Sequence, residues 1–283
     1  MPVPRGSHRA AAPLPGRPVA GWRRTLRFWI SRVVAGLLVR AYVRLRVEGK
    51  EHVPATPVLY CANHLGWVDP IFLIAALPTR PRFALFGPKE EDMGTGGRNR
   101  LMTWSGLAVP YKPGKNDLLD TTRRVQAVFD AGWSLGIFGE GRIHRGERGL
   151  LPLSEGAAYF ALRAGVPIVP VAINGTSRLG FGHPVRVRFG EPLTASGRPT
   201  REAVEALTDR LSAAILGLVA DFPDPPPSGR FGRWLTEVFN DWEVAEATAP
   251  PTRSSATSAS GPEPLVTTEP LAAIEPPASP PAG

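Results

Sequence analysis

A histidine followed five residues later by an aspartate is the first candidate for chemistry in this sequence. His64 and Asp69 lie in the stretch Asn63–Pro70, directly after the apolar run Val58–Ala62. Imidazole exchanges a proton near neutral pH, and it is an effective base when an acceptor such as a carboxylate holds its second ring nitrogen. On a regular helix this spacing places two side chains about 140° apart, so the pairing requires the irregular turn that Gly66 permits. His64 and Asp69 are therefore the candidate catalytic pair.

A plainer interpretation assigns both residues to local structure. Asp69 suits the N-cap of a helix, and Pro70 suits its first turn. His64 would then be a polar loop residue. Both interpretations place His64 in a turn between a buried strand and a helix.

The stretch Asn63–Asp69 after a buried strand resembles the first motif of the glycerophospholipid acyltransferase superfamily, the 1-acylglycerol-3-phosphate acyltransferase-like enzymes. In that family the histidine activates the hydroxyl of the acyl acceptor, and the aspartate orients the histidine. The resemblance implies that His64 and Asp69 are catalytic and that Asn63 belongs to the substrate-binding residues.

A second glycine-rich turn follows another apolar run and is similar to the family's third motif, Phe-Pro-Glu-Gly-Thr-Arg-Ser. Phe138, Glu140 and Gly141 match, whereas Gly139 replaces the proline and Arg142 stands where the threonine would be. Glycine lets main-chain amides approach a ligand, and arginine donates to phosphate in a fork. The alternative is a turn with solvated arginines. The resemblance implies that Glu140, Gly141 and Arg142 bind substrate, with the phosphate-binding arginine displaced by one place.

Two further stretches resemble the remaining family motifs. Gly106–Lys112 is similar to the second motif, with Lys112 in the position of an arginine, and lysine binds phosphate as a point charge. Val166–Val171 resembles the fourth motif, in which Pro170 helps to shape the substrate cleft. The four motifs imply acyl transfer from acyl-CoA or acyl carrier protein to a lysophospholipid such as 1-acylglycerol-3-phosphate, in phospholipid biosynthesis, without another cofactor.

Short apolar runs alternate with amphipathic segments through the middle of the chain. This alternation predicts an α/β fold with a largely parallel or mixed central sheet flanked by helices. The predicted strands are 45–47, 58–62, 83–86, 107–111, 134–138, 168–173 and 185–189, and the predicted helices are 70–77, 97–104, 118–131, 154–164 and 200–220.

The positive charge is concentrated at the N-terminus. Residues 1–50 contain 11 Lys or Arg and one acidic residue, whereas residues 51–283 contain 22 basic and 24 acidic residues. A basic arm joined to an apolar stripe favours an anionic membrane surface over nucleic acid. We therefore expect a peripheral or monotopic protein on the cytoplasmic face of the cell membrane.

Residues 21–44 form the predicted amphipathic helix that precedes the sheet. Arg32 and Arg40 interrupt its apolar run, which argues against a transmembrane span, and Arg40 predicts a bend or break near Gly36–Arg40. The helix could contact lipid, pack on its own domain, or do both. Its predicted apolar stripe consists of Trp22, Leu26, Trp29, Ile30, Val33 and Leu37.

The chain divides into four predicted segments. Residues 1–20 are a disordered basic leader, residues 21–44 the membrane-surface helix, and residues 45–221 the α/β acyltransferase domain. Residues 222–283 are a Pro-rich, mostly disordered tail with a short helix at 230–242.

Other classes of site find little support in the sequence. Cys61 is the single cysteine and lies within an apolar strand, which argues against a disulfide or a reactive thiol. The remaining histidines lack ligand spacing, so no metal is expected. The sequence leaves open a catalytically silent protein of the same fold that uses its basic arm to bind a membrane surface or nucleic acid.

Overall fold

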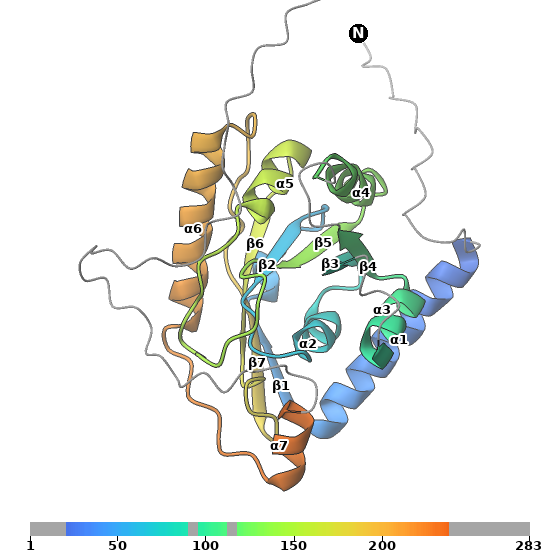
Figure 1. Ribbon diagram of the computed structural model, residues 1–283, viewed down its shortest axis with the longest axis vertical. Helices are drawn as coiled ribbons and strands as arrows, with labels where there is room; N and C mark the ends of the chain where they lie inside the picture. Colours follow the sequence, from blue (N-terminus) through green and yellow to red (C-terminus); the bar gives the residue numbers. More distant parts are fainter. Residues whose placement is uncertain (1–20, 90–95, 112–117, 238–283) are drawn as a thin grey trace, which may run out of the picture. The chain divides into compact units, whose positions relative to one another are not determined.

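The computed structural model describes residues 21–89, 96–111 and 118–237 (Figure 1). Its helices are α1 (Gly21–Tyr42), α2 (Asp69–Ala76), α3 (Gly96–Ser105), α4 (Leu118–Asp130), α5 (Gly156–Ala164), α6 (Arg201–Val219) and α7 (Arg230–Glu237). A short 3-10 turn, η1, covers Lys50–His52. The strands are β1 (Arg44–Glu48), β2 (Leu59–Ala62), β3 (Phe83–Lys89), β4 (Ala108–Tyr111), β5 (Ser134–Phe138), β6 (Ile168–Asn174) and β7 (Pro184–Phe189).

The strands form one mixed sheet in the order β1-β7-β6-β2-β5-β3-β4. β6, β2, β5, β3 and β4 are parallel to one another, whereas β7 runs antiparallel to β6 and pairs in parallel with β1. Central parallel strands are covered on both faces, which explains why β2 and β6 are buried along their whole length. The predicted fold class is confirmed.

Helices cover both faces of the sheet. Tyr60 and Ala62 face a core that includes residues of α1 and α2, whereas Leu59 and Cys61 face a core built with α4, α5 and α6. Successive strand residues point to opposite faces, so the short run of β2 contributes to both cores. β2 is therefore fixed in the middle of the sheet, and the turn that follows it starts from a rigid position.

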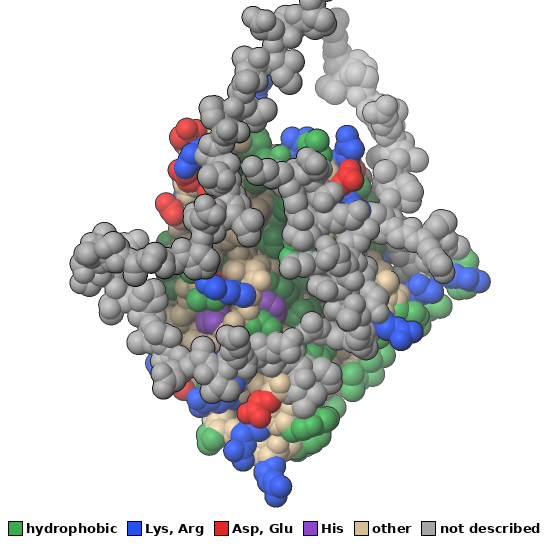
Figure 2. Space-filling model, in the orientation of Figure 1, with side chains coloured by type: hydrophobic (Ala, Val, Ile, Leu, Met, Phe, Trp, Pro, Cys, Tyr) green, Lys and Arg blue, Asp and Glu red, His purple; other side chains and the backbone are tan. Residues whose placement is uncertain are grey.

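α1 packs on the sheet with a face that the apolar stripe did not predict. Phe28, Ala35 and Val39 are buried, whereas Trp22 and Leu37 are 65% and 66% exposed. The whole predicted stripe is exposed, so the helix has apolar residues on two sides. Figure 2 shows hydrophobic side chains along α1, with Lys and Arg side chains near its upper end. The helix packs on its own domain through Phe28, Ala35 and Val39 and leaves the predicted stripe at the surface.

The break predicted within this helix is wrong. α1 continues from Gly21 to Tyr42, and the guanidinium of Arg40 bonds to Gly36 O at 3.2 Å along the helix surface. Arg32 instead turns inward and donates to the carbonyl oxygens of Ile74 and Leu77 at the end of α2. These bonds satisfy carbonyls that a helix end leaves without partners. In the described part of the chain, no helix has the length and apolar character needed to cross a bilayer.

The C-terminal part of the described chain ends in α7. The helix predicted over 230–242 is present over Arg230–Glu237, and its remainder lies outside the described residues. The leader at 1–20 and the tail beyond Glu237 also lie outside them.

Candidate active site

The carboxyl ends of three adjacent parallel strands bring the candidate residues together. Ala62 of β2 pairs with Phe138 of β5 and Val171 of β6, so the turns after β2 and β5 leave the sheet at the same edge. The amide of Gly139 bonds to Ala62 O at 3.1 Å, which holds the second turn against the first. Ligand sites in open α/β sheets lie at such edges.

His64 and Asp69 form the pair that the sequence predicted. His64 Nδ1 lies 2.8 Å from Asp69 Oδ2, and the same oxygen accepts the amides of Leu65 at 2.6 Å and Gly66 at 2.8 Å. Asp69 is the first residue of α2, and its fully buried carboxylate binds the preceding turn; the N-cap position belongs to Val68. Since a carboxylate only accepts, the Nδ1 proton of His64 points to Asp69, and Nε2 keeps its lone pair for a substrate.

Phe138 fixes the plane of the histidine ring. The rings of His64 and Phe138 are stacked with centroids 4.2 Å apart and an angle of 22° between their planes. The His64 side chain remains 17% exposed. The ring is thus held on one face and at Nδ1 while a reactant can still reach it.

Asn63 ties the catalytic turn to the neighbouring strand. Its side-chain Nδ2 donates to Ile173 O at 3.0 Å, and its Oδ1 accepts the Ile173 amide at 2.7 Å. The residue is fully buried. The side-chain amide of Asn63 therefore makes the two hydrogen bonds that a strand residue would make to β6. It does so in the protein interior, beside His64.

The carboxylate of Glu140 is buried against the same turn. It lies 3.0 Å from His144 Nε2, and the main-chain amide of His144 donates to His64 O at 3.0 Å. The Gly146 amide donates to His144 Nδ1 at 3.1 Å, so the neutral imidazole carries its proton on Nε2, facing Glu140. Burial raises the pKa of Glu140 above its ordinary value of 4.5, and the hydrogen bond from His144 opposes that rise.

Gly141 and Arg142 lie further out on the loop after β5. Gly141 has φ 67°, a left-handed conformation that favours glycine, and both residues are exposed. Lys112 lies outside the described residues. Pro170 is buried within β6, where it pairs with Cys61 and its carbonyl accepts the Gly190 amide. The structure thus brings Asn63, His64, Asp69 and Glu140 together and leaves Pro170 inside the sheet.

A close approach to Cys61 explains why Gly139 stands where the family's third motif has proline. A Cβ on Gly139 would lie 2.7 Å from Cys61 Sγ and 2.9 Å from Leu153 Cδ2. Burial raises the pKa of the Cys61 thiol to about 12. The thiol is therefore protonated at neutral pH, and it packs against the turn beside the catalytic pair.

Glu147 is a buried carboxylate that the sequence analysis missed. It accepts Asn174 Nδ2 and the Gly175 amide, each at 2.8 Å, and both the amide and the hydroxyl of Ser177. Burial raises the pKa of Glu147, and these hydrogen bonds oppose the rise. The carboxylate fastens the loop after β5 to the end of β6. Its one signal in the sequence was an acidic residue among arginines and glycines.

The family described as Acyltransferase matches residues 44–174. A chloroplastic 1-acyl-sn-glycerol-3-phosphate acyltransferase, BAT2, of Brassica napus is 24% identical over 160 residues, covering 56% of this chain and 45% of that protein. The 1-acyl-sn-glycerol-3-phosphate acyltransferase alpha of Mus musculus is 26% identical, covering 62% and 63%.

A relative that is named for a different acceptor lipid is also similar. The lyso-ornithine lipid O-acyltransferase of Pseudomonas aeruginosa is 32% identical over 162 residues, covering 57% of this chain and 58% of that protein. This chain thus spans about half of the length of the curated relatives that it matches. The crystal structure of the 1-acyl-sn-glycerophosphate acyltransferase PlsC from Thermotoga maritima shares the fold, with a TM-score of 0.52 at 19% identity over 69% of this chain and 80% of that one.

Proposed function

Residues 44–174 belong to the glycerophospholipid acyltransferase superfamily, and from this premise we propose that the protein is an O-acyltransferase of phospholipid biosynthesis. It transfers a fatty acyl group from acyl-CoA or acyl carrier protein to the hydroxyl of a lysophospholipid such as 1-acylglycerol-3-phosphate. The observation that carries this proposal is the 2.8 Å contact between His64 Nδ1 and Asp69 Oδ2, which leaves Nε2 directed away from the carboxylate.

The reaction needs one base and no covalent enzyme intermediate. His64 Nε2 removes the proton of the acceptor hydroxyl as its oxygen attacks the carbonyl carbon of the thioester. The carbon–sulfur bond then breaks, and the proton on Nε2 passes to the leaving thiolate. Asp69 stabilises the imidazolium that forms between these two steps. One carbon–oxygen bond forms, one carbon–sulfur bond breaks, the proton moves from the hydroxyl to the thiolate, and His64 returns to its neutral form.

The surroundings of the pair keep it in position. Phe138 holds the ring plane, and Asn63 ties the residue before His64 to β6. Glu140 contacts His144, whose amide donates to the main-chain carbonyl of His64. A misplacement of about 1 Å in a catalytic group can cost about a hundredfold in rate. We therefore assign positioning roles to Asn63 and Glu140, although the sequence had predicted that they bind substrate.

The exposed apolar face of α1 supports action at a membrane surface. Trp22, Leu26 and Leu37 are among its exposed residues, and Arg23 and Arg27 lie beside them. Such a helix binds the interface of anionic bilayers by burial of apolar area and by charge. A lysophospholipid acceptor resides in that interface, so we propose peripheral association with the cytoplasmic face of the cell membrane.

The purified protein should be incubated with radiolabelled acyl-CoA and a panel of acceptors. The panel contains lysophosphatidate, other lysophospholipids, glycerol 3-phosphate and lyso-ornithine lipid, because one relative is named for the last. We expect a labelled diacyl phospholipid with wild-type protein. If no acceptor receives an acyl group from either acyl-CoA or acyl carrier protein, the proposed function is refuted and a catalytically silent surface protein is favoured.

A further inference from the structure

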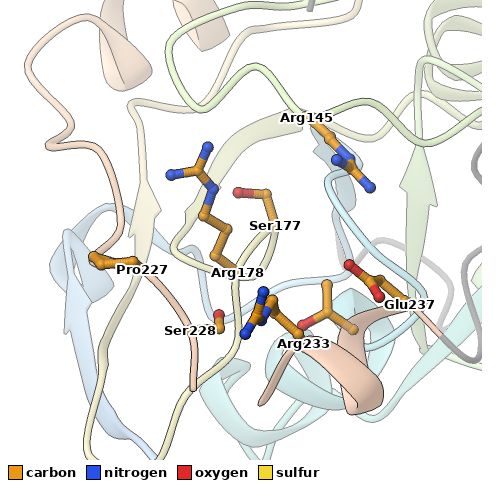
Figure 3. Close-up of a pocket in the computed structure, with 8 residues that line it drawn as sticks. Arg145, Ser177, Arg178, Pro227, Ser228, Arg233 and Glu237 are labelled. Carbon is orange, nitrogen blue, oxygen red and sulfur yellow. The ribbon is translucent and has the colours of Figure 1, made fainter. Parts of the chain in front are cut away.

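A cavity beside the catalytic turns is lined by basic side chains from three parts of the chain. Its volume is about 430 Å³. We name it the arginine pocket (Figure 3), and its lining consists of Arg145, Ser177, Arg178, Pro227, Ser228, Arg233, Thr236 and Glu237. The size lies within the range of small-ligand sites in proteins.

The charge of the arginine pocket is strongly positive. Arg145 follows β5, Arg178 follows β6 and Arg233 belongs to α7, whereas Glu237 is the single acidic residue of the lining. Among the described residues, Arg178 and Arg233 form no ion pair. The Ser228 hydroxyl is buried without a hydrogen-bond partner in the described part of the chain. Guanidinium groups and a hydroxyl are the donors that a phosphate group accepts from.

The walls of the pocket are held by buried hydrogen bonds. Ser177 bonds to the Glu147 carboxylate through both its amide and its hydroxyl. On the opposite wall, Thr236 Oγ1 accepts the Leu179 amide at 3.1 Å. A Cβ on Gly232 would lie 2.2 Å from Leu179 O, so α7 approaches this loop as closely as glycine allows. The arginines thus project from a frame that is fixed before any ligand binds.

Two contacts connect the pocket with the catalytic pair. Arg145 directly follows His144, whose amide bonds to His64 O at 3.0 Å. On the other side of the same turn, Trp67 Nε1 donates to Leu235 O of α7 at 3.1 Å. The arginine pocket therefore adjoins the turn that carries His64, and a substrate anchored there can extend toward the base.

A second face of α7, next to the one that lines the pocket, is apolar and exposed. Phe231 and Trp234 are 61% and 52% exposed, and their rings lie 5.5 Å apart. Tyr42 at the end of α1 contacts both Phe231 and Phe181 edge to face. These aromatic residues continue the exposed apolar surface of α1. Cationic and aromatic side chains on one helix match an amphiphile that has an anionic head and an acyl chain.

We propose that the arginine pocket binds the phosphate of the lysophospholipid acceptor, an inference that rests on the proposed function. Phosphate recognition then depends on Arg178 and Arg233, which lie outside residues 44–174 of the matched family. The acyl chain of the acceptor lies along Phe231 and Trp234. In 1-acylglycerol-3-phosphate the phosphate is on the carbon next to the one that bears the reacting hydroxyl, whereas a pantetheine arm separates the phosphates of coenzyme A from its thioester. A pocket that adjoins the His64 turn therefore suits the phosphate of the acceptor and not those of coenzyme A.

Binding and kinetics of arginine variants test this assignment. Binding of lysophosphatidate in detergent micelles is measured without an acyl donor, beside monoacylglycerol of the same chain length. Arg178→Ala and Arg233→Ala should each weaken lysophosphatidate binding, and raise its KM, by roughly ten- to a hundredfold, the loss of one charge-assisted hydrogen bond. The KM for acyl-CoA should stay unchanged. Arg178→Lys should lose less, because it keeps the charge.

Arg210→Ala is the matched control, since Arg210 is an exposed arginine on α6. It should bind lysophosphatidate like the wild type. Equal losses for lysophosphatidate and monoacylglycerol, a raised KM for acyl-CoA alone, or wild-type binding by both alanine variants would each overturn the assignment. The binding measurement needs no turnover, so it separates failure of this inference from failure of the proposed acyltransferase function.

Discussion

Asp69→Asn is the smallest change that separates the charge of this side chain from its shape. Asp69 Oδ2 accepts three hydrogen bonds, from the amides of Leu65 and Gly66 and from His64 Nδ1. Because one oxygen accepts all three bonds, the asparagine carbonyl can take its place and keep both amides and the Nδ1 proton, with the NH₂ group at the position of Oδ1, which has no hydrogen-bond partner in the described part of the chain. The tautomer of His64 is then kept, and the variant loses the negative charge that stabilises the imidazolium formed during proton transfer.

The magnitudes follow from these contacts. A hydrogen bond to a charged group contributes about 1.5–3 kcal/mol, so loss of the Asp69 charge beside the imidazolium should lower kcat by about 10- to 100-fold. Exchanging a buried charge-assisted hydrogen bond for a neutral one should lower the free energy of unfolding by about 1–3 kcal/mol. Acyl-transfer kinetics and urea unfolding measure the two effects separately.

A double-mutant cycle with His64→Ala checks that the two residues act as one unit. Once His64 is absent, no imidazolium forms, so Asp69→Asn should cause little further loss of kcat. A folded Asp69→Asn protein with the wild-type kcat would refute the role of the Asp69 charge. Multiplicative losses in the double variant would also contradict it.

Three further predictions concern pH, membrane contact and packing. The pKa of Glu140 is raised in the folded state, which therefore binds more protons than the unfolded state, and the free energy of unfolding falls as pH rises above 4.5. Glu140→Gln should lessen that fall in urea unfolding between pH 4 and about 7. An unchanged dependence on pH would show that the fall comes from other groups. Leu37→Glu should reduce flotation with anionic liposomes, whereas the control Leu216→Glu on α6 should not; equal binding by both would move the membrane contact away from α1. Gly139→Ala should lower the free energy of unfolding by about 1–3 kcal/mol, with partial recovery in the Gly139→Ala/Cys61→Ala double variant; thermal denaturation identical to wild type would show that the turn relaxes freely.

The sheet and the catalytic pair could be predicted because their signals are local. The apolar run Val58–Ala62 is a strand covered on both faces, and Gly66 allows the turn that brings His64 to Asp69. The stretch also matched a family motif, which weighed against the plainer interpretation of a helix cap. The structure adds that the carboxylate binds the turn itself, since it accepts two main-chain amides there.

Other features depend on partners far away in the sequence. Asn63 bonds to Ile173, 110 residues later, and a single buried asparagine has no periodic signal. Glu147 finds its partners in the turn after β6, which no local pattern predicts. Two faces of α1 are apolar, and the helical period alone does not show which of them is buried. The stripe predicted from the sequence is the face with Trp22 and Leu37, whereas the buried face carries Phe28, Ala35 and Val39.

The arginine pocket illustrates a similar limit. The sequence predicted phosphate binding at Arg142 and Lys112, because both lie within stretches that resemble family motifs. Lys112 lies outside the described residues, and Arg142 is not part of the lining of the arginine pocket, whereas Arg145, Arg178 and Arg233 line it. They come from segments that only the packing of α7 brings together.

The central claim is that His64 is the base for acyl transfer, and His64→Ala tests it most directly. The assay measures the initial rate of labelled acyl transfer from acyl-CoA to the best acceptor of the panel, with circular dichroism and thermal unfolding as the check on folding. Loss of a general base lowers rates by about 10²- to 10⁴-fold, and we expect a loss of that order or greater. A folded His64→Ala protein that keeps most of the wild-type rate would contradict the mechanism.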